Sequence, residues 1–376
     1  MTEGDFMKRD SSVELSRILG SLIVIGVHVC LPSFTEWGCD RSRLFISCLV
    51  ADGVAVFWII TGFFYFNNTY SKIGHKTLKK IGIPMLVFSV LSFYLSGWLL
   101  NDLTLLQSIR HTKEEYINIF KTLLTWNNPV PAGSHLWYLY TYILLVVIFP
   151  ILKSFIDYLE AKPEKRIKAY LIMSFVFLVI NDAASNQLAD FSLKSVSALL
   201  PASIEVTYGY FLYKNKEFFC RKRWIILAPA IFLTVNIVRM MIQIKRYAGN
   251  PGENSILFWF SSLGVICAAC IVIFGFALDS CIKSTGVKTW ICRIASYTML
   301  IYIVHTYVNA FLGKYGVTEK INVYLLEHVP HVTYDFIYVV VFTVLVFVIS
   351  LAAAIIIRMI SGGAAKVFAH KSKQFF

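Results

Sequence analysis

The sequence predicts an all-α protein that crosses a membrane about ten times and keeps both termini in the cytoplasm. Of its 376 residues, 57% are hydrophobic and 15% are charged, and the mean hydropathy is +0.66. A soluble protein of this composition has too few polar groups to cover its apolar surface. The apolar residues also lie in long runs separated by short loops, and the lysines and arginines favour alternate loops, as in multi-pass membrane proteins.

Ten apolar segments account for the predicted spans, and most approach the roughly 20 residues that a bilayer core requires. The longest predicted outer loop, about residues 101–133, is too small for an independent domain. We therefore expect one membrane domain over residues 1–376, with no appended soluble domain. The segments are 13–33, 47–66, 81–100, 134–152, 169–182 (the shortest), 192–213, 224–242, 256–278, 294–313 and 333–357.

Basic residues orient the predicted bundle. With a cytoplasmic N-terminus, the predicted inner segments carry most of the 35 lysines and arginines. This positive-inside pattern accounts for the formal net charge of +13 without a nucleic-acid partner. The eight cysteines form no evident disulfide framework. Cys267 and Cys270 lie in an apolar run, so we interpret them as helix-packing residues and expect no metal site.

Arg17 and His28 in the first span are the leading candidates for a functional site, because charged or ionisable groups are costly in a bilayer. Eleven positions at about 100° per residue make three turns plus roughly 20°, so both side chains lie on one helix face about 16 Å apart. Glu14 can pair with Arg17 one turn away. Arg17 at the cytosolic end suits a phosphate-bearing ligand, and a neutral His28 suits proton abstraction from a hydroxyl. The alternatives are a snorkelling arginine and a packing histidine.

Two further groups extend this polar face. Lys79 and Lys80 lie at the inner end of the third span, where the positive-inside rule alone also explains them. His135, Trp137 and Tyr138 lie at the outer end of the fourth span, where an aromatic belt is the alternative.

Glu205, Arg239 and His305 complete the set of polar candidates within the predicted spans. For Glu205 and Arg239, the alternative to a functional role is an ion pair with each other across the bundle. For His305, the alternative is a hydrogen bond that holds two helices together.

Four sequence pieces resemble the integral-membrane acyltransferase family 3, which O-acylates cell-envelope glycans. Arg17 and His28 match the family's arginine and histidine with ten residues between them. "FWIITGFFY" is similar to its Phe-Phe-x-x-Ser-Gly stretch, with Thr61 replacing serine. "HLWYLYTYI", "SYTMLIYIVHTYV" and the ending "VTYGYFLYKN" are similar to later family segments. The resemblance covers about residues 11–315.

The chain also departs from the family pattern. Lys79 and Lys80 stand where the family often has arginines, and lysine supplies charge without the bidentate fork. Ala55 replaces the aspartate that often precedes the Phe-Phe pair. We expect no esterase-like domain after the membrane domain, so the chain resembles the short, stand-alone members of the family, such as the O-acetyltransferase of enterobacterial common antigen.

The resemblance implies an O-acyltransferase, with acetyl-CoA as donor substrate and no permanently bound cofactor. Arg17, Lys79 and Lys80 would hold the CoA phosphates, and His28 would take a proton from a sugar hydroxyl or carry the acyl group transiently. Expected partners are acyl-CoA, a glycan or lipid-linked saccharide, and the lipids of a bacterial cytoplasmic (inner) membrane. The residues expected to support His28 or to shape the acceptor side are Glu14, Trp137, Tyr138, Glu205, Arg239 and His305.

Two other classes fit the same polar residues. A secondary transporter of a glycan precursor or a small polar solute also has about ten spans and intramembrane charges. Such transporters often show paired, broken spans in matching halves, which this sequence does not display clearly. A non-catalytic membrane protein, in which the polar residues only join helices, is the third class.

Overall fold

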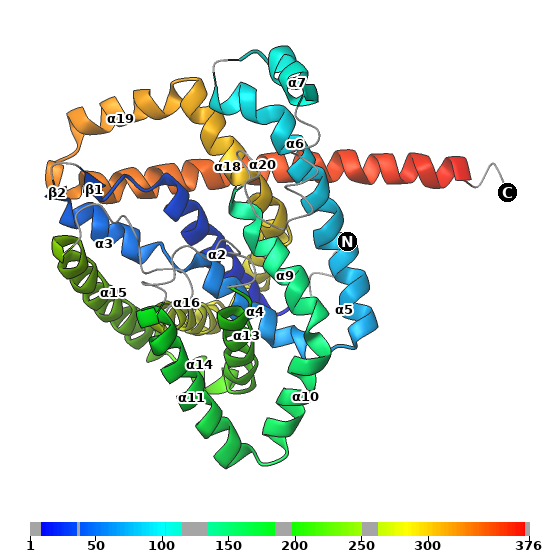
Figure 1. The fold of residues 1–376 in the computed structure, drawn as a ribbon, viewed down its shortest axis with the longest axis vertical. Coiled ribbons are helices and arrows are strands. Elements are labelled where there is room, and N and C mark those ends of the chain that lie inside the picture. Colours follow the sequence, from blue (N-terminus) through cyan, green and yellow to red (C-terminus); the bar gives the residue numbers. More distant parts are fainter. Residues whose placement is uncertain are drawn as a thin grey trace.

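The computed structural model describes residues 9–35, 38–101, 103–114, 134–184, 198–249 and 262–372, and this part of the chain is almost entirely helical (Figure 1). The exception is an antiparallel pair of two-residue strands, β1 (Phe34–Thr35) and β2 (Gly38–Cys39). The helices are α2 (Ser11–Val29), α3 (Arg41–Leu49), α4 (Gly53–Tyr65), α5 (Tyr70–Thr77), η1 (Leu78–Gly82), α6 (Ile83–Leu100), α7 (Leu105–Glu114), η2 (Ser134–Leu136), α9 (Trp137–Val147), α10 (Phe149–Glu160), α11 (Pro163–Ala184), α13 (Leu199–Lys214), α14 (Lys216–Phe219), α15 (Trp224–Gly249), α16 (Ser262–Cys281), α17 (Thr285–Ala295), α18 (Thr298–Lys314), α19 (Val317–His328) and α20 (His331–Ser372).

The first helix, α2, lies in the interior of the bundle, in contact with α4, α16, α17, α18 and α20. It begins at Asp10, whose side chain caps the helix by accepting a hydrogen bond from the Ser12 amide. Burial opposes ionisation of Asp10, but an ion pair with Lys216 at 2.6 Å and the Ser12 bond outweigh it and lower the pKa of this carboxyl. The cap and the ion pair together fix the start of α2 against α14.

The closest helix approach joins α4 to α13 at two glycines. A Cβ atom on Gly62 would lie 1.9 Å from the Val206 carbonyl oxygen, and one on Gly209 would lie 1.9 Å from the Ile59 carbonyl oxygen. Only glycine leaves room for backbones this near, as in small-residue interfaces of membrane helices. This contact presses α4 between α13 and α2, which places Trp58 in a fully buried position.

Six helical stretches are long and apolar enough to cross a membrane: Ser11–Val29, Arg41–Tyr65, Tyr70–Leu100, Trp224–Lys245, Ser262–Cys281 and His331–Ser361. Two bent pairs raise the number to eight if each pair is one span. These are α9 with α10, which meet at 64°, and α17 with α18, which meet at 57°. The chain is therefore an all-helical protein with six to eight candidate spans within its described residues.

The structure has at most eight candidate spans, whereas the sequence predicts ten, and the predicted fifth and sixth spans account for the difference. The fifth lies within α11 and the sixth mostly within α13, and neither helix meets the length and composition criteria over its described residues. Residues 192–197 and 256–261, where the predicted sixth and eighth spans begin, lie outside the described residues. Ten spans and cytoplasmic termini stay predictions.

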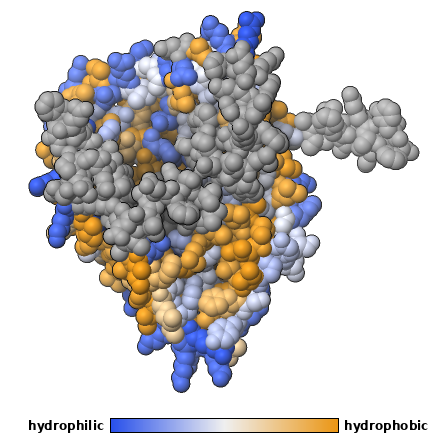
Figure 2. Space-filling model, viewed as in Figure 1, coloured by the Kyte–Doolittle hydropathy of each residue, from blue (hydrophilic) through white to orange (hydrophobic). Residues whose placement is uncertain are grey.

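The outer surface has the character of a membrane protein. Figure 2 shows hydrophobic residues over much of the flank, with hydrophilic residues at the tip where α10 meets α11. Ile151, Met173 and Ile226 are each at least 70% exposed, which is unfavourable for large apolar side chains in water. By contrast, 72% of the apolar window of α16 is buried, and only 22% of that of α20. The chain is thus a multi-pass membrane protein in which α20 and α15 face outward.

Candidate functional site

Three histidines from three different helical segments meet at the C-terminal end of α2. The ring centroids of His28 and His305 are 5.0 Å apart, those of His135 and His305 are 4.9 Å apart, and those of His28 and His135 are 6.2 Å apart. His28 comes from α2, His135 from η2 and His305 from α18. We call these residues the histidine cluster. The structure therefore brings together two candidates that lie 277 positions apart in the sequence, His28 and His305.

Hydrogen bonds distinguish the three rings. His135 Nε2 lies 3.1 Å from the Ile303 carbonyl oxygen, and its Nδ1 lies 3.1 Å from the Thr306 hydroxyl. Because a carbonyl only accepts, Nε2 carries the proton and Nδ1 accepts from the hydroxyl, so both nitrogens of a neutral His135 are occupied. These two hydrogen bonds fix the ring of His135, which lines the site.

His305 and His28 retain unpaired ring nitrogens. His305 Nδ1 donates to the Tyr302 carbonyl oxygen at 2.6 Å, and its Nε2 is buried without a hydrogen-bond partner among the described residues. The ring of His28 makes no hydrogen bond in the same part of the chain, whereas its backbone carbonyl accepts one from the Asn309 side chain at 3.2 Å. These two neighbouring imidazoles are the groups in the cluster with nitrogens available to a substrate.

A narrow cavity lies beside His28. Its walls include Val24, Gly53, His135, Trp137 and Tyr302. Its volume, about 10 Å³ for the centres of water-sized atoms, leaves room for about one water molecule. An acyl thioester would require these walls to separate.

Aromatic side chains support the cluster from the α4 and α9 side. The Tyr302 hydroxyl donates to the backbone carbonyl of His135, which ties α18 to η2. The ring of Tyr302 lies 5.4 Å from that of Tyr138, which packs in turn 4.2 Å from Trp58. Tyr138 is thus a second layer behind the cavity, and Trp137 is the member of the predicted pair that lines it.

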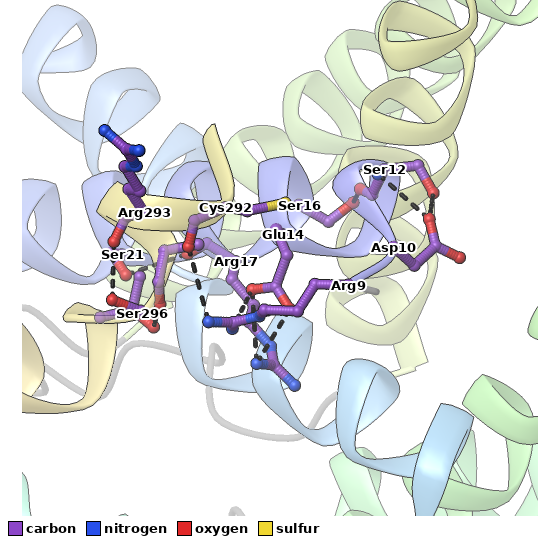
Figure 3. Close-up of polar contacts among 12 residues, drawn as sticks. Arg9, Asp10, Ser12, Glu14, Ser16, Arg17, Ser21, Cys292, Arg293 and Ser296 are labelled. Atoms are coloured by element: carbon purple, nitrogen blue, oxygen red, sulfur yellow. Dashed lines mark hydrogen bonds and ion pairs between the residues drawn. The ribbon is translucent and has the colours of Figure 1, made fainter. Parts of the chain in front are cut away.

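Arg17 lies near the start of α2, on a cationic surface. Figure 3 shows the guanidinium groups of Arg9 and Arg17 converging on the carboxylate of Glu14. The Arg9–Glu14 ion pair measures 2.7 Å and the Arg17–Glu14 pair 3.4 Å. Glu14 is almost fully buried, whereas the side chain of Arg17 is 28% exposed. One carboxylate shared by two arginines leaves positive charge at this end of the helix.

The lysines before the third span extend this charge. Lys79 and Lys80 are exposed on η1, a π-helical segment of a kind that often marks functional sites. The positive charge of Lys80 lies close enough to those of Lys76, Arg9 and Arg17 to be repelled by each. It also interacts with Arg358 of α20. We call Arg9, Arg17, Lys76, Lys80 and Arg358 the cationic mouth.

Arg239 belongs to a different environment, and the expected pair with Glu205 is wrong. Arg239 makes two hydrogen bonds to the carboxylate of Asp52, at 2.8 and 3.3 Å, and a third to the Cys48 carbonyl oxygen at 3.3 Å. Both partners are almost fully buried. This bidentate pair connects α15 to the α3–α4 junction.

Glu205 is fully buried on α13, and neither carboxyl oxygen has a hydrogen-bond partner among the described residues. A buried carboxyl without a partner is rare in proteins. Among the described residues, Glu205 makes no hydrogen bond to a member of the histidine cluster, so its supporting role stays a prediction from sequence.

His135 and Tyr302 are the site residues that sequence reasoning undervalued. From the sequence, an aromatic belt explains His135 equally well, although it opens the "HLWYLYTYI" segment. Tyr302 lies three residues before His305 in "IYIVH", a spacing that places both on one helix face. Within the described residues, no group of three or more His, Cys, Asp or Glu side chains is arranged to hold a metal ion.

These observations define a multi-pass helical membrane protein in which the central helix α2 contributes His28 to a histidine cluster and Arg17 to a cationic mouth. Residues 10–359 match a family model described as an acyltransferase domain, so the chain belongs to acyltransferase family 3. The match extends beyond residue 315 and includes most of α20. No curated protein and no solved structure matches the chain significantly.

Proposed function

We propose that the protein is an O-acyltransferase that moves an acetyl group from cytosolic acetyl-CoA to a hydroxyl of a cell-surface or lipid-linked glycan. In this proposal the chain crosses a bacterial inner membrane ten times with both termini in the cytoplasm. The observation that carries it is the pair of imidazoles with available nitrogens, His28 and His305, on the same central helix bundle as the cationic mouth.

The cationic mouth suits the phosphates of the donor. Arg17 offers a guanidinium fork for bidentate phosphate binding, and Lys80 of the mouth adds a point charge. Lys79, next to Lys80 on η1, would supply a second point charge. The axial distance from Arg17 to His28 is about 16 Å along α2. The long, thin pantetheine arm would follow this length and bring the thioester to His28 once Trp137 and Tyr302 move apart.

The transfer itself requires a base and a proton return. A neutral His28 nitrogen would take the proton of the sugar hydroxyl as the oxygen attacks the thioester carbonyl carbon. The carbon–sulfur bond then breaks, and the CoA sulfur leaves with the proton from the His28 imidazolium. In the covalent variant, a His28 nitrogen attacks the thioester carbonyl carbon first, and the carbon–sulfur bond breaks to release the CoA thiolate. The sugar oxygen then takes the acetyl group from His28, and the hydroxyl proton passes to the thiolate. His305 orients His28 in either route.

The acceptor class that the resemblance implies is an envelope glycan, and enterobacterial common antigen is one example to assay. Purified protein is incubated with acetyl-CoA labelled in the acetyl group, with and without isolated envelope glycan. We expect label on the glycan, and label on the protein alone when the glycan is omitted if the covalent route operates. Uptake of unmodified glycan into protein-containing vesicles, without any acetyl transfer, would contradict the proposal and favour a transporter.

A further inference from the structure

The small cavity beside His28 is lined by two kinds of residue from two parts of the bundle. Rings come from η2, α9 and α18, in His135, Trp137 and Tyr302. Residues without a ring or a polar side-chain group come from α2, from α4 and from the turn before α4, and they are Val24, Val27, Ala51, Gly53 and Val54. We call the first group the aromatic wall and the second the aliphatic wall.

The aliphatic wall is fixed by close contact between α2 and α4. A Cβ atom on Gly53 would lie 2.6 Å from the Val24 amide nitrogen and 3.0 Å from the Gly20 carbonyl oxygen, so the two backbones already touch here. Val24 and Val54 are 3% and 6% exposed and pack in one hydrophobic cluster. Because a core of this kind is close-packed, neither valine can withdraw from the cavity without displacing a helix.

The aromatic wall is less constrained. Trp137 is only partly buried. In the described part of the chain, no glycine brings the backbone of α2 as close to η2, α9 or α18 as Gly53 brings it to α4. A thioester therefore reaches His28 through the aromatic wall. The end of its acyl group then points away from the entry and meets the aliphatic wall.

We propose that Val24 and Val54 restrict the transferred acyl group to acetyl, an inference that rests on the proposed acyl transfer. The cavity leaves room for about one water molecule, and a methyl group is of similar size. A propionyl group carries one more methylene, for which the two valines leave no space. One methylene in an apolar pocket changes the specificity constant about 10–200-fold. Val24 and Val54 are specificity-determining residues in this account, and His28 keeps the chemistry.

The test compares two donors on the purified full chain, with isolated envelope glycan as acceptor. Acetyl-CoA and propionyl-CoA, each labelled in the acyl group, give two values of kcat/KM, and their ratio is the selectivity. We expect the parent to favour acetyl-CoA about 10–200-fold. Val54→Ala removes two methyl groups from the wall and should lower the selectivity at least about fivefold, because propionyl transfer becomes faster. Val24→Ala should act in the same direction.

The matched control is Val56→Ala. Val56 is fully buried on the same helix, two residues after Val54, but it packs in a different cluster and is not among the described residues that line the cavity. This variant loses the same two methyl groups and should keep the parent selectivity. An equal change in Val54→Ala and Val56→Ala would show a general loosening of α4 and would overturn the pocket.

Val54→Ile makes the opposite change, because it adds a methyl group beside the cavity. Acetyl transfer should fall at least about tenfold, the effect of one carbon too many in a filled apolar pocket. The affinity for CoA, which has no acyl group, should stay within about twofold of the parent, because the change does not touch the cationic mouth. Acetyl transfer by Val54→Ile at the parent rate would contradict the pocket.

The experiment separates this inference from the function on which it rests. Acetyl transfer by the parent, with unchanged selectivity in both Val54→Ala and Val24→Ala, would overturn the acyl pocket and leave the acyltransferase proposal standing. Absence of transfer from either donor would overturn the acyltransferase proposal and the pocket together.

Discussion

The histidine cluster and the Asp52–Arg239 pair are both buried polar regions, yet they satisfy their polar groups in opposite ways. Arg239 and Asp52 direct two hydrogen bonds to each other, and Arg239 adds a third to a backbone carbonyl. In the cluster, His305 Nε2 and the His28 ring have no such partner among the described residues. A polar region whose opposite charges bind each other stabilises a fold, and one whose ring nitrogens face no partner has capacity for a ligand.

The largest expected effect of this difference is on the rate of transfer. Replacing His28 by alanine should lower the acetyl-transfer rate by roughly 10²–10⁴-fold, the usual contribution of a general base. The unfolding temperature should change little, because the His28 ring makes no hydrogen bond that stabilises the described fold. Initial rates with labelled acetyl-CoA and glycan measure the transfer rate, and a thermal unfolding curve measures the unfolding temperature.

The control for His28 is another histidine outside the site. His328 lies on α19, exposed, and its Nδ1 bonds only to the backbone of its own helix. His328→Ala should transfer at the parent rate. A His28→Ala protein that is correctly inserted and equally active would remove His28 from the mechanism.

The second effect is on stability. Replacing Arg239 by leucine leaves the carboxylate of Asp52 buried without its partner, which should destabilise the protein by about 3–5 kcal/mol. Replacing both partners, as Asp52→Leu with Arg239→Met, should recover most of that loss because no unpaired charge remains. Unfolding by denaturant in detergent measures both. A single variant as stable as the parent would contradict the structural role of the pair.

The third effect is on donor affinity. Arg17→Ala should raise the KM for acetyl-CoA about 10–100-fold, the loss of one or two charge-assisted hydrogen bonds of about 1.5–3 kcal/mol in total. The KM of Arg17→Lys should lie between those of the parent and of Arg17→Ala, because lysine keeps the charge without the guanidinium fork. A steady-state titration of acetyl-CoA checks this, with Arg221→Ala as a control in a basic loop that contributes no residue to the cationic mouth. An unchanged KM in Arg17→Ala would remove it from the donor site.

The smallest effect concerns the bond that orients His135. Thr306→Val keeps the shape of the side chain but removes the hydroxyl that donates to His135 Nδ1. We expect a loss of stability of about 1 kcal/mol and a fall in transfer rate of less than about tenfold, because the bond acts on a wall of the site. A fall as large as that in His28→Ala would place His135 in the chemistry instead.

The same contrast shows what the sequence allowed us to predict. The shared face of Arg17 and His28 follows from helix periodicity, a local property, and α2 is continuous from Ser11 to Val29. The Glu14–Arg17 contact is equally local. The partner of Arg239 was not predictable in this way, because the choice between Asp52 and Glu205 depends on how α15 packs against α3 and α4.

The histidine cluster and the span count required the tertiary structure for similar reasons. His135 and His305 reach His28 only because the chain bends between α17 and α18 and folds η2 against α18. Apolar composition indicated a membrane protein, but it did not show where helices bend. At Ile148, two residues before Pro150, α9 gives way to α10 at 64°, within one predicted span.

The most direct test measures donor binding and acetyl transfer on the same two preparations, His28→Ala and Arg17→Ala. If the mouth binds the donor and the histidine cluster performs the transfer, His28→Ala should bind acetyl-CoA within about twofold of the parent and transfer at least 100-fold more slowly. Arg17→Ala should bind at least tenfold more weakly and approach the parent rate at saturating donor. Equal losses of binding and rate in both variants would contradict a division of roles along α2.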